Sequence, residues 1–421
     1  MKVTLTRKEY VTRYRPDGKV NWSKWIADQE KRIAEQKPIA KIDLSSEDLY
    51  RTLKELGEPS YQETVTAAIV ADQMLSLGYK LNSSSGKADY ETHLLFTAKE
   101  KPSIFVRCDL DAISVGNNRY LHNCGHAINI TAALVLAKRL SDEGINHVGF
   151  IFQPAEEGPG RKEDGYVHPQ GFGGGRYLRA KGIYRQILRV ISCHIDTSLK
   201  PEQVRVSEGQ GTAAAYRFTH TANGIPAHAA LPWQGKNPIE DSMDFLKKLF
   251  ELNAEFKKLP LPNYGLVTPS KIATSECELN SLSDLCTIQG ISRISGLDAL
   301  KLFRNFMKEN GAEVELEAPP VINDSHLAQL ARKTAQEIGF GIVSEPARFR
   351  DETAWAGKIE MPWADPQLYP PGCEAILHFF VSGGNNCGYL HAIENFDPSL
   401  ESINWQVEML YGIASKSKTI L

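Results

Sequence analysis

The chain has 421 residues, of which 42% are hydrophobic and 24% charged, and its formal net charge at pH 7 is −3. This length and balance are typical of a folded protein with two domains and exclude wholesale disorder. A charge so close to neutral offers no general basic field for nucleic acid or anionic membranes. No run approaches the roughly 20 apolar residues of a membrane helix. We therefore expect a soluble protein with neither nucleic acid nor membrane as a partner.

The cysteines and the N-terminus indicate the compartment. Seven cysteines, an odd number scattered over a long chain, argue against a disulfide framework. The segment Met1–Lys8 turns polar before the apolar part of a signal peptide could form. Both features fit a reducing compartment, where a thiolate can serve as a metal ligand. We expect a cytoplasmic location.

The N-terminal part of the chain predicts helices. Residues 1–45 are charged and aromatic and are expected to form an N-terminal arm with a helix over 22–36. Apolar residues then recur at helical spacing over 46–56 and 61–77. The Gly-Glu-Pro-Ser sequence over 57–60 predicts a break between these two helices.

Strands and helices alternate in the next part of the chain. Residues 104–106 and 148–152 are short apolar runs that predict buried strands, and 128–140 predicts an apolar helix between them. This alternation is typical of a sheet covered by helices on both faces. We therefore predict an α/β fold with a mixed, mostly parallel sheet, whose first part occupies 46–203.

The stretch 204–317 has a different pattern and predicts a small α+β domain inserted into the larger one. Alternation predicts a strand over 214–220, and an amphipathic segment predicts a long helix over 238–259. The order βαβαβ is completed by a strand, a helix and a strand over 285–293, 297–310 and 313–317.

A proline pair at 319–320 marks the return to the large domain. The second part of that domain is expected over 318–421. A helix over 325–338 is predicted near its start.

Cysteine and histidine stand close together in the segment His122-Asn123-Cys124-Gly125-His126, between a predicted strand and a predicted helix. A thiolate and an imidazole two residues apart on a loop can reach the same ion, and they suit zinc, manganese or nickel better than calcium. Such triplets also occur by chance, and a buried structural cysteine is common. The segment is a candidate metal site that needs further ligands.

A pair of carboxylates, Glu156 and Glu157, follows the predicted strand over 148–152. In an open α/β sheet, ligands bind at the carboxyl ends of the strands. One carboxylate of such a pair can coordinate a metal while the other moves protons as general base and acid. A solvated acidic turn is the alternative interpretation.

Two further histidines extend the candidate ligand set. His194 ends a short apolar run, and His391 lies near the C-terminus in the segment 385–391. Taken singly, each histidine is more often a structural residue than a ligand. Together, however, loop positions after apparent strands supply a cysteine, three histidines and a glutamate, a set that could hold two metal ions.

The order of these motifs resembles the bimetal amidohydrolase and carboxypeptidase family that contains aminoacylases, hippurate hydrolases and plant auxin-conjugate hydrolases. The family's Arg-Ala-Asp-Met-Asp-Ala-Leu-Pro, His-Ala-Cys-Gly-His-Asp and Phe-Gln-Pro-Ala-Glu-Glu runs correspond here to 107–114, 122–127 and 152–157. A later Gly-x-x-x-His run corresponds to 224–228. The resemblance implies a metallohydrolase catalytic domain with an inserted lid and dimerisation domain.

The resemblance also implies a role for each matching position. It makes Glu156 the general base and acid. It makes His228, in the inserted domain, the residue that reaches into a partner subunit's site to hold the oxyanion. Asn280 and Arg293 match positions near the substrate carboxylate. The implied ligands of two divalent ions, zinc or manganese with nickel and cobalt as further candidates, are Cys124, His126, Glu157, His194 and His391.

Such an enzyme would cleave the amide bond of an N-acyl amino acid or a similar small conjugate that carries a carboxylate. Glu156 would take a proton from a metal-activated water and pass it to the leaving amine. The inserted domain and the frequency of closed two-fold dimers favour a homodimer. The alternatives are a metallo-dipeptidase or carboxypeptidase acting on short peptides, and a non-catalytic homologue that serves as a binding module.

The sequence departs from the family pattern in several places. Ala127 stands where the family has an aspartate, and Ser114 stands where it has a proline. The segment 350–353 matches the usual Ser-Glu-Asp-Phe run only loosely, and an insertion over 159–172 follows the glutamate pair. The lost acid predicts weaker binding of one ion, and the insertion predicts an additional wall of the pocket.

Overall fold

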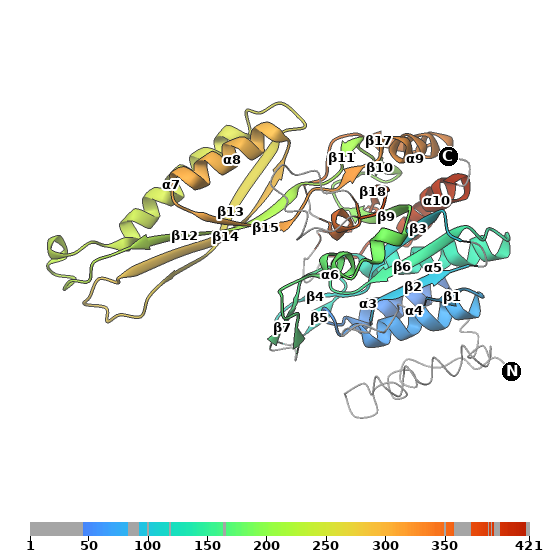
Figure 1. The fold of residues 1–421 in the computed structure, drawn as a ribbon, viewed down its shortest axis with the longest axis horizontal. Helices are drawn as coiled ribbons and strands as arrows, with labels where there is room; N and C mark the ends of the chain where they lie inside the picture. The colour runs from blue at the N-terminus through green and yellow to red at the C-terminus, as the bar shows by residue number, and fades with distance from the viewer. Residues whose placement is uncertain are drawn as a thin grey trace, which may run out of the picture. The chain divides into compact units, whose positions relative to one another are not determined.

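The computed structural model describes residues 45–82, 92–98, 101–117, 119–162, 166–348, 351–357, 372–385, 387–388, 390 and 396–417. The helix predicted over 22–36 and the ligand candidate His391 lie outside these residues. The chain divides into two compact units (Figure 1). Unit 1 comprises Met1–Gly209, Asn323–Ser344 and Trp355–Leu421, and unit 2 comprises Gln210–Ile322 and Glu345–Ala354. Most of the predicted inserted domain, 204–317, falls within unit 2.

Unit 1 is built around an eight-stranded sheet. In sheet order its strands are β1 (Lys80–Leu81), β2 (Leu94–Thr97), β6 (Val148–Gln153), β3 (Ile104–Asp109), β9 (Arg189–Asp196), β18 (Ala375–Ser382), β10 (Gln203–Arg205) and β17 (Gly341–Val343). The central strands β6, β3, β9 and β18 run parallel to one another. Antiparallel pairs join β1 to β2, β2 to β6 and β18 to β10. The predicted mixed, mostly parallel sheet is confirmed.

The central strands explain their own sequence pattern. β3 and β6 are buried along their whole length. A strand that is covered on both faces gives a continuous apolar run instead of an alternating one, which is why 104–106 and 148–152 predicted strands correctly. The carboxyl ends of β3, β6 and β9 lie at the same edge of the sheet, because these strands are parallel neighbours.

Helices complete unit 1. They are α3 (Ser46–Leu56), α4 (Thr64–Ser76), α5 (His126–Asp142), α6 (Gly174–Ala180), α9 (Ser325–Glu337) and α10 (Glu401–Lys416). Ser45 and Asp324 cap α3 and α9, since their side-chain oxygens accept backbone N–H groups at 3.1 and 3.0 Å. The predicted helices at α3, α4, α5 and α9 are confirmed. The strand β18 and the helix α10 had not been predicted.

Unit 2 contains a four-stranded antiparallel sheet in the order β13 (Tyr264–Thr274), β14 (Leu285–Ser295), β12 (Ala214–Asn223) and β15 (Glu313–Ala318). The helices α7 (Pro238–Phe256) and α8 (Leu297–Glu309) pack against it. Buried aromatic rings join the layers: Phe218 on β12 lies 6.3 Å from Phe245 on α7, and Tyr216 lies 5.2 Å from Phe303 on α8.

The predicted βαβαβ order of this unit was wrong, because β13 had been missed. The observed order is βαββαβ. Most of β13 is exposed, so its sequence lacks the apolar alternation that marks a half-buried strand. Pro269 lies within β13 at a shift of register, and β13 is an edge strand, where proline is tolerated in a sheet.

The remaining elements of the two units are short. Two-residue strands pair as β4 (Ile113–Ser114) with β5 (Tyr120–Leu121), β7 (Gly160–Arg161) with β8 (Tyr166–Val167), and β11 (Gly209–Gln210) with β16 (Ile322–Asn323). Single 3₁₀ turns occupy Ile183–Gln186, Pro232–Gln234 and Glu352–Trp355. Within the described part of the chain, no helix is long and apolar enough to cross a membrane.

Candidate metal centre

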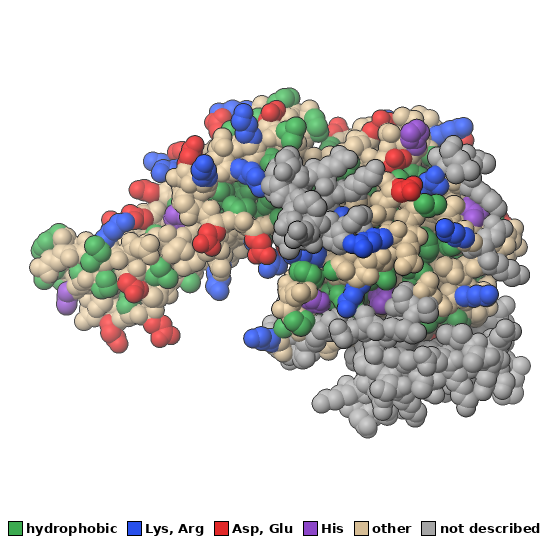
Figure 2. Space-filling view, viewed as in Figure 1, with side chains coloured by type: hydrophobic (Ala, Val, Ile, Leu, Met, Phe, Trp, Pro, Cys, Tyr) green, Lys and Arg blue, Asp and Glu red, His purple; other side chains and the backbone are tan. Residues whose placement is uncertain are grey.

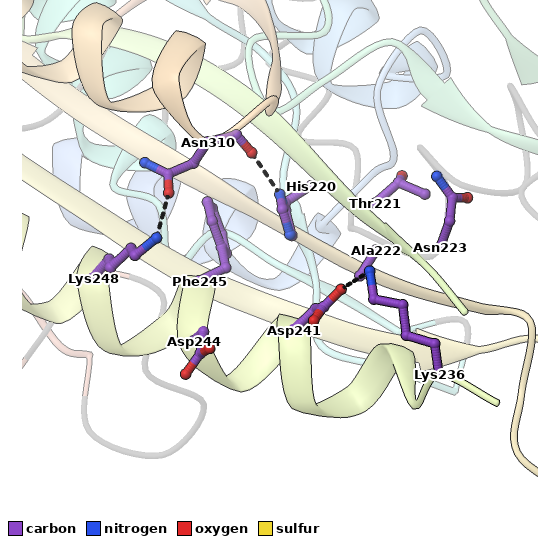
Figure 3. Close-up of a pocket in the computed structure, with 10 residues that line it drawn as sticks. All are labelled: His220, Thr221, Ala222, Asn223, Lys236, Asp241, Asp244, Phe245, Lys248 and Asn310. Atoms are coloured by element: carbon purple, nitrogen blue, oxygen red, sulfur yellow. Dashed lines mark hydrogen bonds and ion pairs between the residues drawn. The ribbon is translucent and has the colours of Figure 1, made fainter. Parts of the chain in front are cut away.

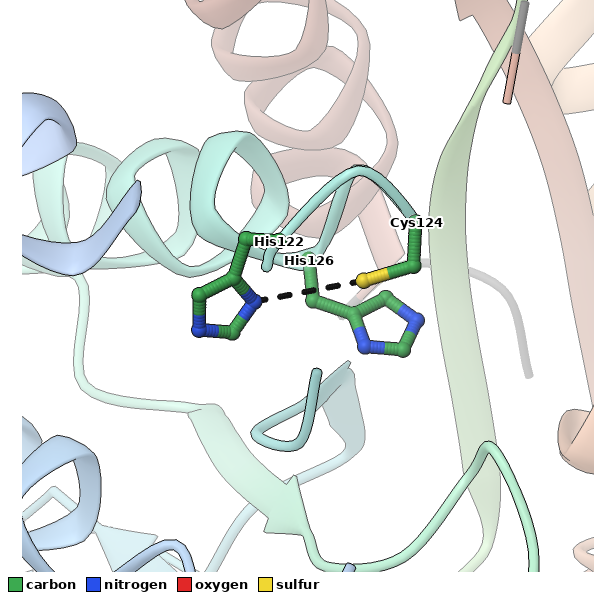
Figure 4. Close-up of side chains that lie close together, drawn as sticks. All are labelled: His122, Cys124 and His126. Carbon is green, nitrogen blue, oxygen red and sulfur yellow. Dashed lines mark hydrogen bonds between the residues drawn. The ribbon is translucent and has the colours of Figure 1, made fainter. Parts of the chain in front are cut away.

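The His122–His126 turn brings Cys124 to the start of α5, whose first residue is His126 (Figure 4). All three side chains of the His-x-Cys-x-His pattern are buried, and the Sγ of Cys124 lies 3.9 Å from the Nδ1 of His122. Gly125 makes the turn with φ at 99°, a value that disfavours side chains. A Cβ atom on Gly125 would also meet Ile195 at 2.9 Å and the His194 ring at 3.3 Å. Glycine is therefore needed for the approach of β9.

Two histidine rings are oriented by backbone carbonyl groups. The Nδ1 of His126 lies 2.8 Å from the main-chain oxygen of Asp111, and the Nδ1 of His194 lies 2.9 Å from that of Ile195. A carbonyl oxygen can only accept, so in both rings Nδ1 carries the proton of the bond and Nε2 is left to bind a ligand. The two rings lie nearly perpendicular, with centroids 5.6 Å apart.

The buried carboxylate of Asp111 organises the loop that follows β6. It accepts the backbone N–H of Glu156 at 3.0 Å and that of Glu157 at 2.9 Å, and the hydroxyl of Ser60 donates to it at 2.8 Å. The carboxylate of Glu156 approaches the His122–His126 turn, since its Oε2 lies 3.9 Å from the Nε2 of His126. The two motifs found in the sequence are thus neighbours in space.

Burial and neighbouring charges set the protonation of this cluster. Burial lowers the pKa of His126, but Cys124, Asp109 and Asp111 together raise it well above its ordinary value. Burial also raises the pKa of the Cys124 thiol, although His126 opposes this shift. Without a metal, both groups therefore hold their protons more tightly than usual.

The donor groups fit a transition-metal centre. His122, Cys124 and His126 each offer an atom within 4.8 Å of the others, and so do His126, Glu156 and Glu157. Thiolate, imidazole and carboxylate together suit zinc or manganese. The Nε2 of His122 is buried and has no hydrogen-bond partner among the described residues. His126 belongs to both of these groups of possible ligands.

Sequence reasoning missed two residues of this cluster. His122 was part of the motif but received no role, although its spacing from Cys124 and His126 was a signal. Asp111 was also part of a quoted motif, but nothing in the sequence indicated that it would accept hydrogen bonds from residues 45 and 46 positions away.

The predicted residues of the inserted domain lie in unit 2. His228 and Asn280 are both exposed and stand on adjacent segments, because His228 bridges to Ser281 and the N–H of Ala229 donates to the main-chain oxygen of Asn280 at 2.7 Å. Arg293 stands elsewhere in this unit, on β14, with its Nη1 4.0 Å from Glu317. Unit 2 therefore keeps His228 and Asn280 together and Arg293 apart.

The described end of the insertion, 168–172, packs against the loop before α4. The hydroxyl of Tyr61 donates to the main-chain oxygen of Phe172 at 2.8 Å, and the rings of His168 and Phe172 stack 5.2 Å apart. The His168 ring also lies 5.7 Å from that of Tyr61. The end of the insertion is thus attached close to Ser60, one of the partners of Asp111.

A cavity of about 410 Å³ lies in unit 2 between β12 and α7 (Figure 3). His220, stacked on Phe245 at 3.9 Å, forms part of its wall, and Lys236 pairs with Asp241 at its rim. None of the described candidate residues lines this cavity. The residues that line this cavity are therefore different from those of the candidate metal centre.

Comparison with known proteins shows similarity over most of the chain. A model of peptidase family M20/M25/M40 matches residues 106–410. The thermostable carboxypeptidase 1 of Saccharolobus solfataricus is 23% identical, over 70% of this chain and 78% of that protein. The IAA-amino acid hydrolase ILR1-like 2 of Arabidopsis thaliana is 24% identical, over 64% of this chain and 62% of its own length. The hippurate hydrolase of Campylobacter jejuni is 21% identical, over 70% and 80%.

Solved structures share the fold. A chain from methicillin-resistant Staphylococcus aureus, proposed to be an aminohydrolase, superposes with a TM-score of 0.66 at 19% identity and covers 94% of this chain and 99% of that one. The YXEP protein of Bacillus subtilis, described as a dinuclear metal binding peptidase from the M20 family, has a TM-score of 0.63 at 18% identity, with 88% and 96% covered.

Proposed function

This chain belongs to peptidase family M20/M25/M40, and from that premise we propose that it hydrolyses the amide bond of N-acyl amino acids or related small conjugates. It is a hydrolytic enzyme acting on amide bonds. Its relatives include an IAA-amino acid hydrolase, a hippurate hydrolase and a dinuclear metal binding peptidase, and their names support metal-dependent amide hydrolysis. The observation that carries the proposal is the meeting of two motifs: the carboxylate of Glu156 faces the Nε2 of His126 at 3.9 Å.

We propose that the site holds two divalent ions, zinc or manganese with nickel or cobalt as further candidates. Support comes from the fit of the donor groups and from the dinuclear metal binding stated for the Bacillus subtilis relative. When bound, such ions lower the pKa of coordinated water from about 15.7 toward about 7 and polarise a carbonyl group. The proposed ligands are Cys124, His126, Glu157, His194 and His391.

Glu156 is the proposed proton carrier. Its backbone is fixed by Asp111, so its carboxylate can remain beside the ligands without becoming one. A general base must take a proton from the attacking water and a general acid must give one to the leaving amine, and one carboxylate can do both in turn. Glu157, held by the same aspartate at 2.9 Å, is left for coordination.

Unit 2 is the proposed source of oxyanion and carboxylate contacts. His228 would hold the oxyanion in the site of a partner subunit, while Asn280 and Arg293 would contact the substrate carboxylate, to which the planar fork of an arginine is suited. A homodimer through this unit is supported by its surface, on which hydrophobic side chains are visible in Figure 2. Of the large hydrophobic side chains exposed in the described residues, all but Leu188 and Leu400 lie in unit 2. Such exposure is typical of interaction surfaces.

The substrate proposal follows the curated relatives. Hydrolases of IAA-amino acid conjugates and of hippurate both act, by name, on small acylated amino acids. The carboxypeptidase among the relatives keeps peptide hydrolysis as the second candidate. A cytoplasmic location stays a prediction, and all seven cysteines are free thiols, which suits a reducing compartment.

A panel of substrates tests the proposal. We would assay N-acetyl amino acids, aryl-glycine conjugates and dipeptides with added manganese or zinc, with Glu156→Gln as the control. N-acyl amino acids should be hydrolysed, and the rate should fall on chelation and return with metal. Preference for dipeptides would replace the proposal with peptidase activity. No hydrolysis at full metal content would favour a binding module.

A further inference from the structure

Two residues with side chains adopt left-handed backbone conformations next to the candidate centre. Tyr61 has φ at 63° and Ala155 has φ at 53°. Residues other than glycine rarely adopt such values, and they keep them only where the surrounding structure holds them. Tyr61 directly follows Ser60, which donates to Asp111, and Ala155 directly precedes Glu156. One unusual conformation therefore follows a hydrogen-bond partner of Asp111, and the other precedes the proposed proton carrier Glu156.

A single carboxyl oxygen holds both residues. The Oε1 of Glu63 accepts the backbone N–H of Tyr61 at 2.8 Å and the backbone N–H of Ala155 at 2.8 Å. Its other oxygen accepts the hydroxyl of Thr92 at 2.7 Å. Glu63 is completely buried, so these three donors replace the water that a carboxyl group would otherwise require. Glu63 thus joins the start of α4 to the loop after β6.

We infer that Glu63 is a positioning residue for Glu156: by holding Ala155 in its left-handed conformation, it sets the direction in which the next residue leaves the loop. This inference rests on the proposed function, in which Glu156 moves the protons. Among the described residues, the hydrogen bonds of the Glu63 carboxylate reach neither a proposed ligand nor Glu156, so Glu63 acts through the backbone. Without the Glu63 carboxyl, Ala155 loses the hydrogen bond that offsets its unfavourable φ, and its backbone relaxes toward an ordinary conformation.

Glu63 can hold the two backbone N–H groups without being ionised. Burial, aided by the neighbouring Asp111, raises the pKa of Glu63 to about 8. A protonated carboxyl still accepts both N–H groups through Oε1, and it donates to Thr92 instead of accepting. Glutamine has the same arrangement, with a carbonyl oxygen for the two N–H groups and an amide for Thr92. Glu63→Gln should therefore preserve the positioning, whereas Glu63→Ala removes it.

The substitution Ala155→Gly distinguishes a loss of positioning of Glu156 from a general loss of stability. Glycine adopts positive φ without the steric cost of a Cβ, so it needs less help to hold the same turn. In a Glu63→Ala background, Ala155→Gly should restore part of kcat. Glu58 provides a control, because it is also a buried glutamate whose carboxylate accepts backbone N–H groups, those of Val65 and Thr66 in the first turn of α4.

The experiment compares the metal-loaded wild type with Glu63→Ala, Glu63→Gln, Glu58→Ala and Glu63→Ala/Ala155→Gly. We would measure kcat, KM, bound metal, thermal unfolding and hydrogen exchange of the peptide that contains 154–157. Glu63→Ala should lower kcat on the order of 10²-fold, the effect of misplacing a catalytic group by about 1 Å, with metal content unchanged and faster exchange at Ala155. Glu63→Gln should stay near wild type, and the double variant should recover several-fold.

The results can overturn the inference in two ways. If kcat of Glu63→Ala equals that of Glu58→Ala, or if the double variant recovers nothing while its fold is intact, Glu63 has a structural role only. Failure of the proposed function has a different signature. The wild type itself would then hydrolyse no amide, while the exchange measurement would still decide whether Glu63 holds Ala155.

Discussion

Asp111 and Glu156 are joined by a hydrogen bond of 3.0 Å from the backbone N–H of Glu156 to the Asp111 carboxylate. The main-chain oxygen of Asp111 meanwhile accepts the Nδ1–H of His126 at 2.8 Å. One buried residue therefore fixes both the loop of the proposed base and the ring of a proposed ligand.

Glu156→Gln should abolish turnover and leave metal content intact, because it removes a proton carrier and not a ligand. General acid–base catalysis contributes about 10²- to 10⁴-fold, so kcat should fall by at least that much. Glu157→Gln should instead reduce the bound metal. Elemental analysis and steady-state kinetics on both variants check the division of roles, and equal metal loss in the two would contradict it.

Asp111→Asn should weaken both stability and catalysis. The backbone N–H of Glu156 donates to one carboxylate oxygen of Asp111, and the Ser60 hydroxyl and the backbone N–H of Glu157 donate to the other. The NH₂ group of an asparagine would therefore face a donor in either orientation. An unsatisfied buried group costs about 1–3 kcal/mol, and the unfolding midpoint in urea should fall accordingly. Asp142→Asn, at an exposed pair with Lys138, should leave midpoint and kcat nearly unchanged. A stable, fully active Asp111→Asn protein would refute the organising role of Asp111.

Gly125→Ala should lower metal affinity as well as stability. The left-handed conformation costs a residue with a side chain roughly 1–2 kcal/mol, and the new Cβ would also press on Ile195 and His194. Gly144→Ala is a matched control, because φ is 71° there but no atom lies within 4 Å of the added Cβ. Both should unfold at lower denaturant, and Gly125→Ala alone should show a higher Kd for zinc.

Metal binding should strengthen steeply as pH rises from 6 to 8. Ligands must be deprotonated to bind, and the pKa values of both His126 and Cys124 lie above their ordinary ones. Lower pH adds protons that compete with the metal, so apparent affinity falls. Titration calorimetry in two buffers of different ionisation enthalpy should show proton release on binding. An affinity that is constant across this range would rule out these two groups as ligands.

His228→Ala should lower kcat about 10²- to 10³-fold, as expected for loss of an oxyanion donor, without loss of metal. Mixing His228→Ala subunits with Glu156→Gln subunits should restore part of the activity, since one hybrid site would contain both intact residues. Light scattering gives the oligomeric state. A fully active monomer would disprove the assignment of His228.

The sequence by itself determined the features that depend on neighbouring residues. The apolar spacing of 46–56 predicted α3 with its observed bounds, because a helix places residues three and four apart on one face. Continuous apolar runs predicted β3 and β6, since both faces of these strands are covered. The candidate ligands were visible as a set, because a cysteine, three histidines and a glutamate follow apparent strands in order, although a cysteine and a histidine in one turn also occur by chance.

Only the tertiary structure decided how these groups are held. β13 was missed because its stability comes from pairing with β14 and not from a pattern of its own. The role of Asp111 depends on partners 45 and 46 residues away, and that of Glu63 on Ala155, 92 residues away. Hydrogen bonds of this kind leave no periodic trace in the sequence, because their partners meet only after the sheet has brought the ends of β3 and β6 together.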